Sequence, residues 1–365
     1  MVGRESKMNI GILSMQAIPN YGSFLQAFSL KLQFEQRGHN VYFIDIITGR
    51  KIRVTEEQKT NLLKKIDRYF WKRLANYFFY KRMLRVHKND CEEYLQTEIQ
   101  LEQDKRFDLV VIGSDEVFNA TIPSKWGFTT QLFGDIKNAD KIVTYAASCG
   151  STRYEDAEQF GIVKEIRDAM SNLDHISVRD SNTSAFVKNI TGLNPIINVD
   201  PVFISSFDKY IPEVKTKRPY MLIYAYGNRI NEEKEINAIK SYAKKNKLEI
   251  ISVGMQQRWC NHNIVANAFE LLGYVRNATC IITDTFHGAV FSIKYNKRFA
   301  VLVRESNKNK LEDLLAKFSL RTRIINDEAT LDSILGREID YEIINHIIRT
   351  EAGKSHEYID MVTKV

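Results

Sequence analysis

The chain has 365 residues, of which 44% are hydrophobic, and carries a formal net charge of +7. A mean hydropathy of −0.31 is typical of a soluble globular protein, and the length is enough for two domains of ordinary size. No apolar run reaches the roughly 20 residues that a membrane-spanning helix needs, and the N-terminal stretch has no apolar core of signal-peptide length. These features exclude an integral membrane protein, and we expect a cytoplasmic protein.

The first half of the chain alternates between buried strands and amphipathic helices. Strands are predicted at residues 8–14, 38–47, 107–113, 141–148, 176–179 and 196–199. Helices are predicted between them at residues 23–37, 161–173 and 181–191. This succession of strand, helix and strand is the pattern of a parallel sheet that is covered by helices.

The same alternation returns after a linker at 207–219 that contains lysines and prolines. Strands are predicted at residues 220–226, 249–253, 280–283 and 299–303, and helices at 232–246, 269–277 and 289–295. We therefore predict an α/β protein with two doubly wound halves and a cleft between them. The predicted units are an N-terminal domain at 8–206, a C-terminal domain at 207–335 and a C-terminal helix at 336–365.

The positive charge is concentrated in one segment. Residues 50–90 contain thirteen Lys or Arg against four Asp or Glu, an excess of nine that is larger than the charge of the whole chain. Aromatic and leucine side chains recur there at helical spacing, which predicts a basic helical insert. Such an insert fits either peripheral contact with an anionic membrane or a helical hairpin that packs on the domain with a solvated basic face. We expect no nucleic acid as a partner, because no recognisable binding module accompanies the basic residues.

Cysteine usage argues against a disulfide framework and against structural zinc. The four cysteines are scattered without a C-x-x-C pair, at Cys91, Cys149, Cys260 and Cys280. His262 stands two residues after Cys260, but two ligands without partners do not make a metal site. We therefore expect no metal.

Chemistry-bearing residues fill the turn of the strand–turn–helix–strand segment at 280–303. The turn is predicted at 284–288, which places His287 and Gly288 where the next helix begins. Free backbone N–H groups and the positive end of the helix dipole favour an anion at such a position. Histidine can both take and give a proton near neutral pH. The alternative is a structural histidine that caps the helix or fills a gap in the core.

Polar residues and a glycine follow other predicted strands, at the sheet edge where such folds bind ligands. They are Asn20, Tyr21 and Gly22 after the first strand, Ser114, Asp115 and Asn119 after the third, and Arg179 in the fifth. Taken alone, the first group also fits an ordinary loop in which Ser23 caps a helix, and Asp115 fits a solvated carboxylate.

Six segments in order resemble the polysaccharide pyruvyl transferase family: NYGSFLQAFSL, FDLVVIGSDEVFN, KIVTYAAS, ISVRDSNTSAFV, NVDPVF and ITDTFHGAVFSIKYNKRF. The resemblance runs from residue 8 to about residue 360. It implies two Rossmann-like domains that face each other across a cleft, similar to the GT-B glycosyltransferases. The implied activity is transfer of the enolpyruvyl group of phosphoenolpyruvate onto two hydroxyls of one sugar, which gives a pyruvate ketal and phosphate. Phosphoenolpyruvate is then a co-substrate, and no further cofactor is expected.

The resemblance also implies roles for single residues. His287 is the leading acid/base, and Arg179 is expected to bind the carboxylate or phosphate of the donor, although a structural ion pair with Asp180 is the alternative. Asp115 is a possible second base. Further residues expected near the donor are Asp284, Thr285, Gly288, Arg276 and Arg304. Residues expected at the sugar or lipid-linked oligosaccharide acceptor are Asn20, Tyr21, Gly22, Ser114 and Asn119.

One position departs from the family pattern. Some members carry an arginine two residues before the histidine, where this chain has Thr285. Another cation must then bind the donor, and we expect Arg179, Arg276 or Arg304 to do so. Two other functions remain open, a glycosyltransferase that uses a nucleotide sugar and a noncatalytic saccharide-binding subunit of a glycan assembly complex.

Overall fold

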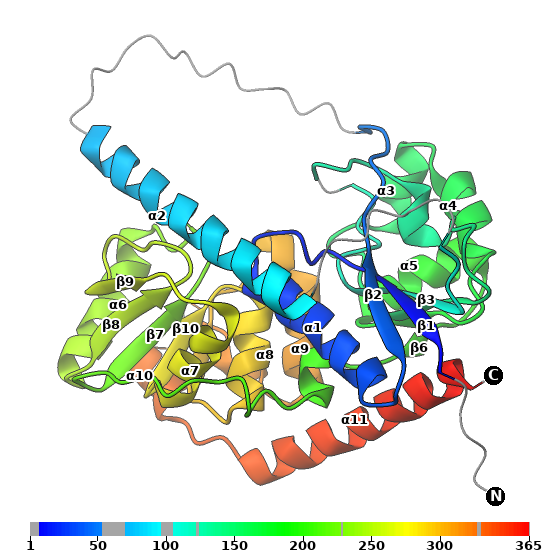
Figure 1. The fold of residues 1–365 in the computed structure, drawn as a ribbon. Coiled ribbons are helices and arrows are strands. Elements are labelled where there is room, and N and C mark those ends of the chain that lie inside the picture. The colour runs from blue at the N-terminus through cyan, green and yellow to red at the C-terminus, as the bar shows by residue number, and fades with distance from the viewer. Residues whose placement is uncertain are drawn as a thin grey trace, which may run out of the picture.

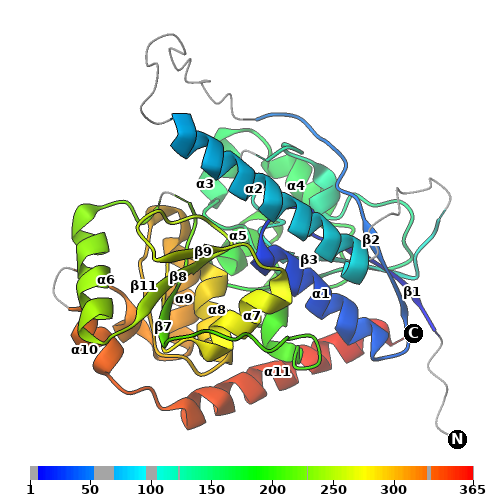
Figure 2. The same ribbon diagram turned by 60° about the vertical axis from the view of Figure 1, so that its left-hand side comes forward.

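The computed structural model describes residues 7–52, 70–95, 105–121, 124–227, 229–326 and 330–364. Two parallel sheets, each flanked by helices, lie side by side (Figure 1). A turned view shows that α1 and α7 lie next to each other between the sheets (Figure 2). The helices that cover the sheets are long enough to keep both faces out of water, as parallel sheets require.

The N-terminal sheet has six parallel strands in the order β2-β1-β3-β4-β5-β6. The strands are β1 Asn9–Leu13, β2 Asn40–Ile44, β3 Leu109–Asp115, β4 Ile142–Ala147, β5 Ser177–Val178 and β6 Ile196–Ile197. Its helices are α1 Tyr21–Glu35, α3 Tyr154–Gln159, α4 Val163–Met170 and α5 Ser181–Thr191. Side chains of β1 alternate between the two faces: Ile10 and Ile12 share a buried cluster with Phe24 of α1, whereas Leu13 shares another with Ile166 of α4.

The C-terminal sheet has five parallel strands in the order β11-β10-β7-β8-β9. The strands are β7 Tyr220–Tyr224, β8 Glu249–Val253, β9 His262–Ile264, β10 Cys280–Thr283 and β11 Phe299–Val301. Its helices are α6 Glu233–Lys245, α7 Ala268–Asn277, α8 Phe286–Lys294, α9 Lys308–Lys317 and α10 Leu331–Gly336. Strand β9 was not predicted, because its polar sequence lacks the apolar pattern of a buried strand.

Helix α11, Tyr341–Thr363, follows the C-terminal sheet in the chain but packs on the N-terminal domain (Figure 1). The Tyr358 hydroxyl donates to the Thr144 carbonyl oxygen at 2.7 Å, and Lys141 Nζ donates to the carbonyl oxygen of Val362 at 3.0 Å. Ile359 is fully buried in the cluster that both domains share. The last helix therefore ties the two halves of the molecule together.

Helix α2, Phe70–Asp90, lies on the outside of the molecule, and a single π-helical turn, Cys91–Leu95, continues it (Figures 1 and 2). It is the described part of the predicted basic insert, of which residues 53–69 lie outside the described ranges. Asp90 Oδ2 accepts a hydrogen bond from the backbone N–H of Ala268 at 2.9 Å, which fixes the end of α2 to the C-terminal domain. Burial raises the pKa of Asp90 to about 7. Within the described ranges, no helix has the length and apolar character to cross a bilayer.

We expect Ile359→Ala to lower the free energy of unfolding by about 2–5 kcal/mol, because it opens a cavity where α11 meets the N-terminal sheet. Ile343→Ala, on the same helix at a position that is 59% exposed, is the control and should change it by less than about 0.5 kcal/mol. Urea unfolding followed by circular dichroism measures both. Equal effects of the two substitutions would contradict the role assigned to this helix.

Candidate active site

A cleft of about 690 Å³ lies between the domains, where the carboxyl ends of both sheets face each other. The N-terminal wall is formed by the segments after β1, β3 and β5, and the C-terminal wall by those after β7 and β10 and by α9. Side chains that line it and can bind or transfer protons are Asn20, Asp115, Glu116, Asn119, Arg179, Tyr226, Arg229, His287 and Lys310. The volume is of the size that small-molecule sites occupy, about 300–1,000 Å³.

A buried carboxylate, Asp200, joins the two domains at the base of the cleft. It follows β6, and its Oδ1 caps a short 3-10 turn by accepting the Val202 N–H at 3.1 Å. Its Oδ2 accepts a hydrogen bond from Arg179 Nη1 at 2.9 Å and lies 3.3 Å from His287 Nε2. Burial favours the neutral acid, but the neighbouring His287 and Arg179 hold the pKa of Asp200 below its usual range. Asp200 is therefore an anion that orients both the imidazole and the guanidinium.

The Arg179 guanidinium has more hydrogen-bond donors than its neighbours in the structure accept. Its side chain is almost fully buried, and within the described part of the chain neither Nε nor Nη2 has a hydrogen-bond partner. The guanidinium carbon lies 4.2 Å from the centre of the Phe286 ring, which fixes the plane of the fork. An unpaired buried N–H group is costly, and these two donors have the geometry to bind two oxygens of one anion.

A second ion pair crosses the domain boundary at the cleft. Lys310 Nζ of α9 and Glu116 Oε1, which follows β3, are 2.5 Å apart, and Asn119 Nδ2 donates to Glu116 Oε2 at 2.7 Å. Burial alone would raise the pKa of Glu116, but Lys310 lowers it to about 2. The pair thus links the two domains, and both of its residues line the cleft.

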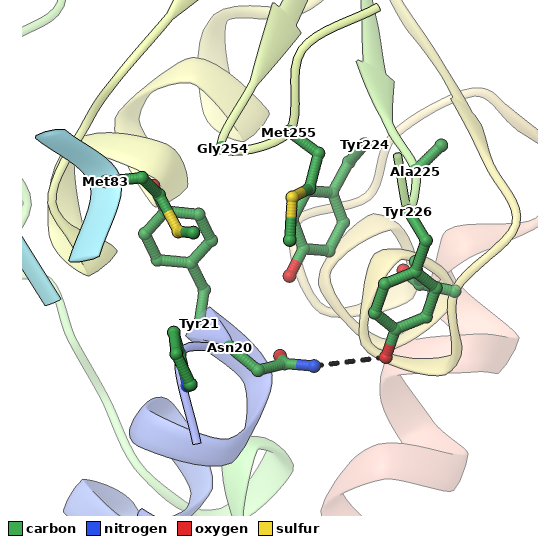
Figure 3. A pocket seen from close by; sticks show the side chains of 10 residues that line it. Asn20, Tyr21, Met83, Tyr224, Ala225, Tyr226, Gly254 and Met255 are labelled. Carbon is green, nitrogen blue, oxygen red and sulfur yellow. Dashed lines mark hydrogen bonds between the residues drawn. The ribbon is translucent and has the colours of Figure 1, made fainter. Parts of the chain in front are cut away.

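The three residues Asn20, Tyr21 and Gly22 all touch the C-terminal domain. Asn20 Nδ2 donates to the Tyr226 hydroxyl at 3.1 Å (Figure 3). The Tyr21 hydroxyl donates to the carbonyl oxygen of Ala266 at 2.7 Å. A Cβ atom on Gly22 would lie 2.0 Å from Nδ1 of His287, so only glycine fits there. This segment, 20–22, holds the domains together and confines the imidazole.

A small side pocket of about 30 Å³ adjoins the cleft beneath α2 (Figure 3). Its lining is mainly aromatic and sulfur-containing, and comprises Tyr21, Met83, Tyr224, Tyr226 and Met255 together with Pro19, Asn20, Ala225, Gly254 and Thr285. Asn20 and Tyr226 line both the side pocket and the large cleft. The polar cleft therefore has an apolar extension on the side of α2.

A family model described as polysaccharide pyruvyl transferase matches residues 20–306. The chain belongs to this family. The match confirms the resemblance that the six sequence motifs indicate, and it covers every residue placed in the cleft except Met15, Ile18, Pro19, Asn307 and Lys310. No curated protein matches the sequence.

Solved structures with a similar fold include GT-B glycosyltransferases. UGT89C1 of Arabidopsis thaliana, solved with UDP-L-rhamnose, has a TM-score of 0.51 at 10% identity, and the alignment covers 99% of both chains. SnogD of Streptomyces nogalater has a TM-score of 0.45 at 11% identity, with 98% of this chain and 100% of that chain covered. At such low identity the likeness concerns the fold alone. The predicted pair of Rossmann-like domains is confirmed.

The turn that contains the family histidine differs from the prediction in one respect. Helix α8 begins at Phe286 rather than at residue 289, because Thr285 Oγ1 caps it by accepting the Gly288 N–H at 2.9 Å. That N–H group therefore already donates a hydrogen bond within the helix cap and is not free to bind an anion. A Cβ atom on Gly288 would lie 2.0 Å from Thr283 Oγ1, so this glycine serves the close packing of α8 on β10.

The side chain of Asp284 is held by contacts within the C-terminal domain. Its Oδ1 accepts the Tyr226 N–H at 3.0 Å, and its Oδ2 lies 3.9 Å from Arg229 Nε. Burial raises the pKa of Asp284, although the Tyr226 N–H and nearby arginines oppose the shift. Asp284, Thr285 and Gly288 build the turn, and none of the three lines the large cleft.

Two arginines expected at the donor lie elsewhere. Arg276 pairs with Asp208 on the surface, and Arg304 binds both carboxylate oxygens of Glu235, each at 2.8 Å. Neither lines the cleft, so the structure does not bring them together with Arg179 and His287. Of the cations proposed to replace the arginine absent at Thr285, only Arg179 lies in the cleft.

Of the residues expected at the acceptor, some line the cleft and others do not. Asp115 and Asn119 line the cleft, and Asp115 Oδ2 accepts a hydrogen bond from Ser23 Oγ at 2.5 Å. Asn119 Oδ1 accepts from Thr152 Oγ1 at 2.7 Å. Ser114 is fully buried, and its hydroxyl donates to the carbonyl oxygen of Ala146 at 3.2 Å. It supports the strand end rather than the cleft.

Asp200, Glu116 and Lys310 were not predicted as site residues. Asp200 and Glu116 both follow strands, so the rule that selected Asp115 would have found them. Lys310 lies in α9, beyond the family motifs, and nothing in the local sequence points to the cleft. Only the packing of α9 across the domain boundary brings it there.

We expect Gly22→Ala to destabilise the protein by about 1–3 kcal/mol, because the new methyl group would overlap the His287 ring. Gly353→Ala is the matched control, since a Cβ atom there meets nothing within 4 Å, and it should be neutral or stabilising by up to about 1 kcal/mol. Thermal unfolding of both variants is the measurement. A Gly22→Ala protein as stable as the control would show that the domains are not held as close as described.

The Glu116–Lys310 pair predicts a pH dependence. Glu116→Gln should cost about 3 kcal/mol at pH 7, because it leaves Lys310 without its counter-ion. The folded-state pKa of about 2 lies below the ordinary 4.5, so the stability that the carboxylate contributes is complete above pH 4.5 and is lost as the pH falls toward 2. Urea unfolding of wild type and variant from pH 7 to pH 3 measures the difference. A difference that grows on acidification would refute the assignment.

Proposed function

We propose that the protein transfers the enolpyruvyl group of phosphoenolpyruvate onto two hydroxyls of one sugar in a cell-surface polysaccharide precursor, forming a pyruvate ketal and releasing phosphate. The observation that carries this proposal is the buried guanidinium of Arg179, whose free Nε and Nη2 donors stand beside the His287–Asp200 pair. Family membership supports the same reaction class.

The donor has two anionic ends that need cations. The paired donors of Arg179 suit a carboxylate or phosphate, because a guanidinium can bind two oxygens of one anion at once. Lys310 supplies a second positive charge on the cleft wall, and Arg229 a third. We assign Arg179 and Lys310 to the two ends of phosphoenolpyruvate, in place of the arginine that this chain lacks at Thr285.

Proton transfer falls to His287. Asp200 faces Nε2 of the ring and orients it, and the His287 side chain lines the cleft, where it can exchange a proton with substrate. The imidazole gives a proton to C3 of the enol, which becomes a methyl group and leaves a developing cation at C2. One sugar hydroxyl adds to C2, the bond from C2 to the phosphate oxygen breaks, and the second hydroxyl adds. Of the two hydroxyl protons, one replaces that used at C3 and the other leaves with phosphate.

The acceptor sugar then lies against the N-terminal wall. Asp115, Asn119 and Asn20 present hydrogen-bonding groups there, and Asp115 is the second base in this proposal. A sugar that carries two neighbouring hydroxyls, free or lipid-linked, fits this description.

Release of phosphate from phosphoenolpyruvate in the presence of a panel of glycans tests the proposal. Arg179→Lys keeps the charge but loses the fork, and we expect it to lower kcat/KM about a hundredfold. His287→Ala should lower kcat about a hundredfold or more, because it removes the acid/base. Arg276→Ala, whose side chain lies outside the cleft, is the control and should be as active as wild type.

The alternative is a glycosyltransferase that uses a nucleotide sugar. Ligand-induced shifts in melting temperature distinguish it from the proposed reaction. Phosphoenolpyruvate should raise the melting temperature, and this shift should vanish in Arg179→Lys but not in Arg276→Ala. Stabilisation by nucleotide sugars without any by phosphoenolpyruvate, or phosphate release that survives in both cleft variants, would reject the proposed reaction.

A further inference from the structure

The sequence of α2 is strongly basic. From Phe70 to Asn89 it contains six Lys or Arg and no Asp or Glu. The one acid of the helix, Asp90, is buried at its end, and Lys88 pairs with Glu92 of the following turn. Lys81, Arg82 and Arg85 therefore repel one another without an acid beside them in the helix. This composition needs an explanation beyond the fold.

The inward side of α2 is accounted for by packing. Met83 lines the side pocket, and His87 lies edge-on to Phe24 of α1 with ring centres 6.4 Å apart. Asp90 accepts the hydrogen bond from Ala268 described above. These contacts fix which side of the helix faces the protein, so the opposite side faces solvent.

That opposite side combines aromatic rings and cations. Tyr77 is 50% and Phe78 60% exposed, and Lys81, Arg82 and Arg85 are also exposed. Lys81 Nζ lies 4.7 Å from the centre of the Tyr77 ring, and no ion pair links Lys81, Arg82 or Arg85 to another described residue. We call these five residues the outer face of α2; they stand at helical spacings of three, four, seven and eight, on one side.

We propose that the outer face of α2 docks the protein on a bilayer surface that contains anionic lipid. The unpaired cations complement lipid phosphates, and exposed aromatic rings partition into the headgroup region, as in interfacial helices. A merely solvated basic face would explain the charges but not two large rings held in water. This inference does not rest on the proposed reaction.

The docking has a geometric consequence. Tyr80, on the same helix, lines the cleft and is itself 46% exposed. A bilayer against the outer face therefore lies close to one edge of the cleft entrance.

Flotation with vesicles tests the proposal, using phosphatidylcholine alone and phosphatidylcholine with one quarter phosphatidylglycerol. We expect the full-length protein to float only with the anionic vesicles. Lys81→Glu/Arg82→Glu/Arg85→Glu should weaken binding more than tenfold, and Phe78→Ser should weaken it severalfold although the charge is unchanged. The matched control is Lys240→Glu/Lys244→Glu/Lys247→Glu, which makes the same charge change at exposed positions in α6 and just after it and should bind like wild type.

Each other result rejects the proposal. No binding of wild type to anionic vesicles would do so directly, and equal loss in the α6 control would show attraction by net charge alone. Unchanged binding of Phe78→Ser would show that the rings do not enter the bilayer. Tighter binding to single-stranded DNA than to vesicles, measured in parallel, would favour nucleic acid as the partner. Melting temperatures of all variants, compared with wild type, separate lost docking from lost folding.

Discussion

The architecture depends on one buried carboxylate. Asp200 sits at the end of β6 and faces a cation from its own domain, Arg179, and an imidazole from the other domain, His287. A buried anion without partners would be expensive, so both neighbours must be present for the domain boundary to be stable. Because Asp200 takes partners from both domains, its contacts hold the two sheet edges close together. The cleft lies between these edges.

Two further polar contacts across the boundary use groups that follow the carboxyl ends of strands in the N-terminal domain. Glu116 pairs with Lys310, and Asn20 donates to Tyr226. These groups are satisfied by the opposite domain, whereas two N–H groups of Arg179 have no partner among the described residues. The contrast separates groups that are already paired across the boundary from the two donors that are free to bind a ligand.

The sequence predicted most of the fold because buried parallel strands are short apolar runs that need no knowledge of their neighbours. It also selected His287 and Arg179, since both stand at strand ends. The predictions from sequence were wrong for features that depend on contacts with other side chains. The capping bond of Thr285 moved the start of α8 forward by three residues, and Arg304 turned to Glu235 rather than to the cleft. Lys310 reaches the cleft only through tertiary packing, which no local pattern encodes.

The contacts of residues 20–22 bear on how substrates come and go. Many enzymes with two facing domains admit their substrates by a hinge motion. Here, opening the hinge would break the hydrogen bonds from Asn20 to Tyr226 and from Tyr21 to Ala266, and would draw Gly22 away from the imidazole. These contacts favour the arrangement in which the two domains stand together, so any widening of the cleft by a hinge motion would carry the cost of breaking them.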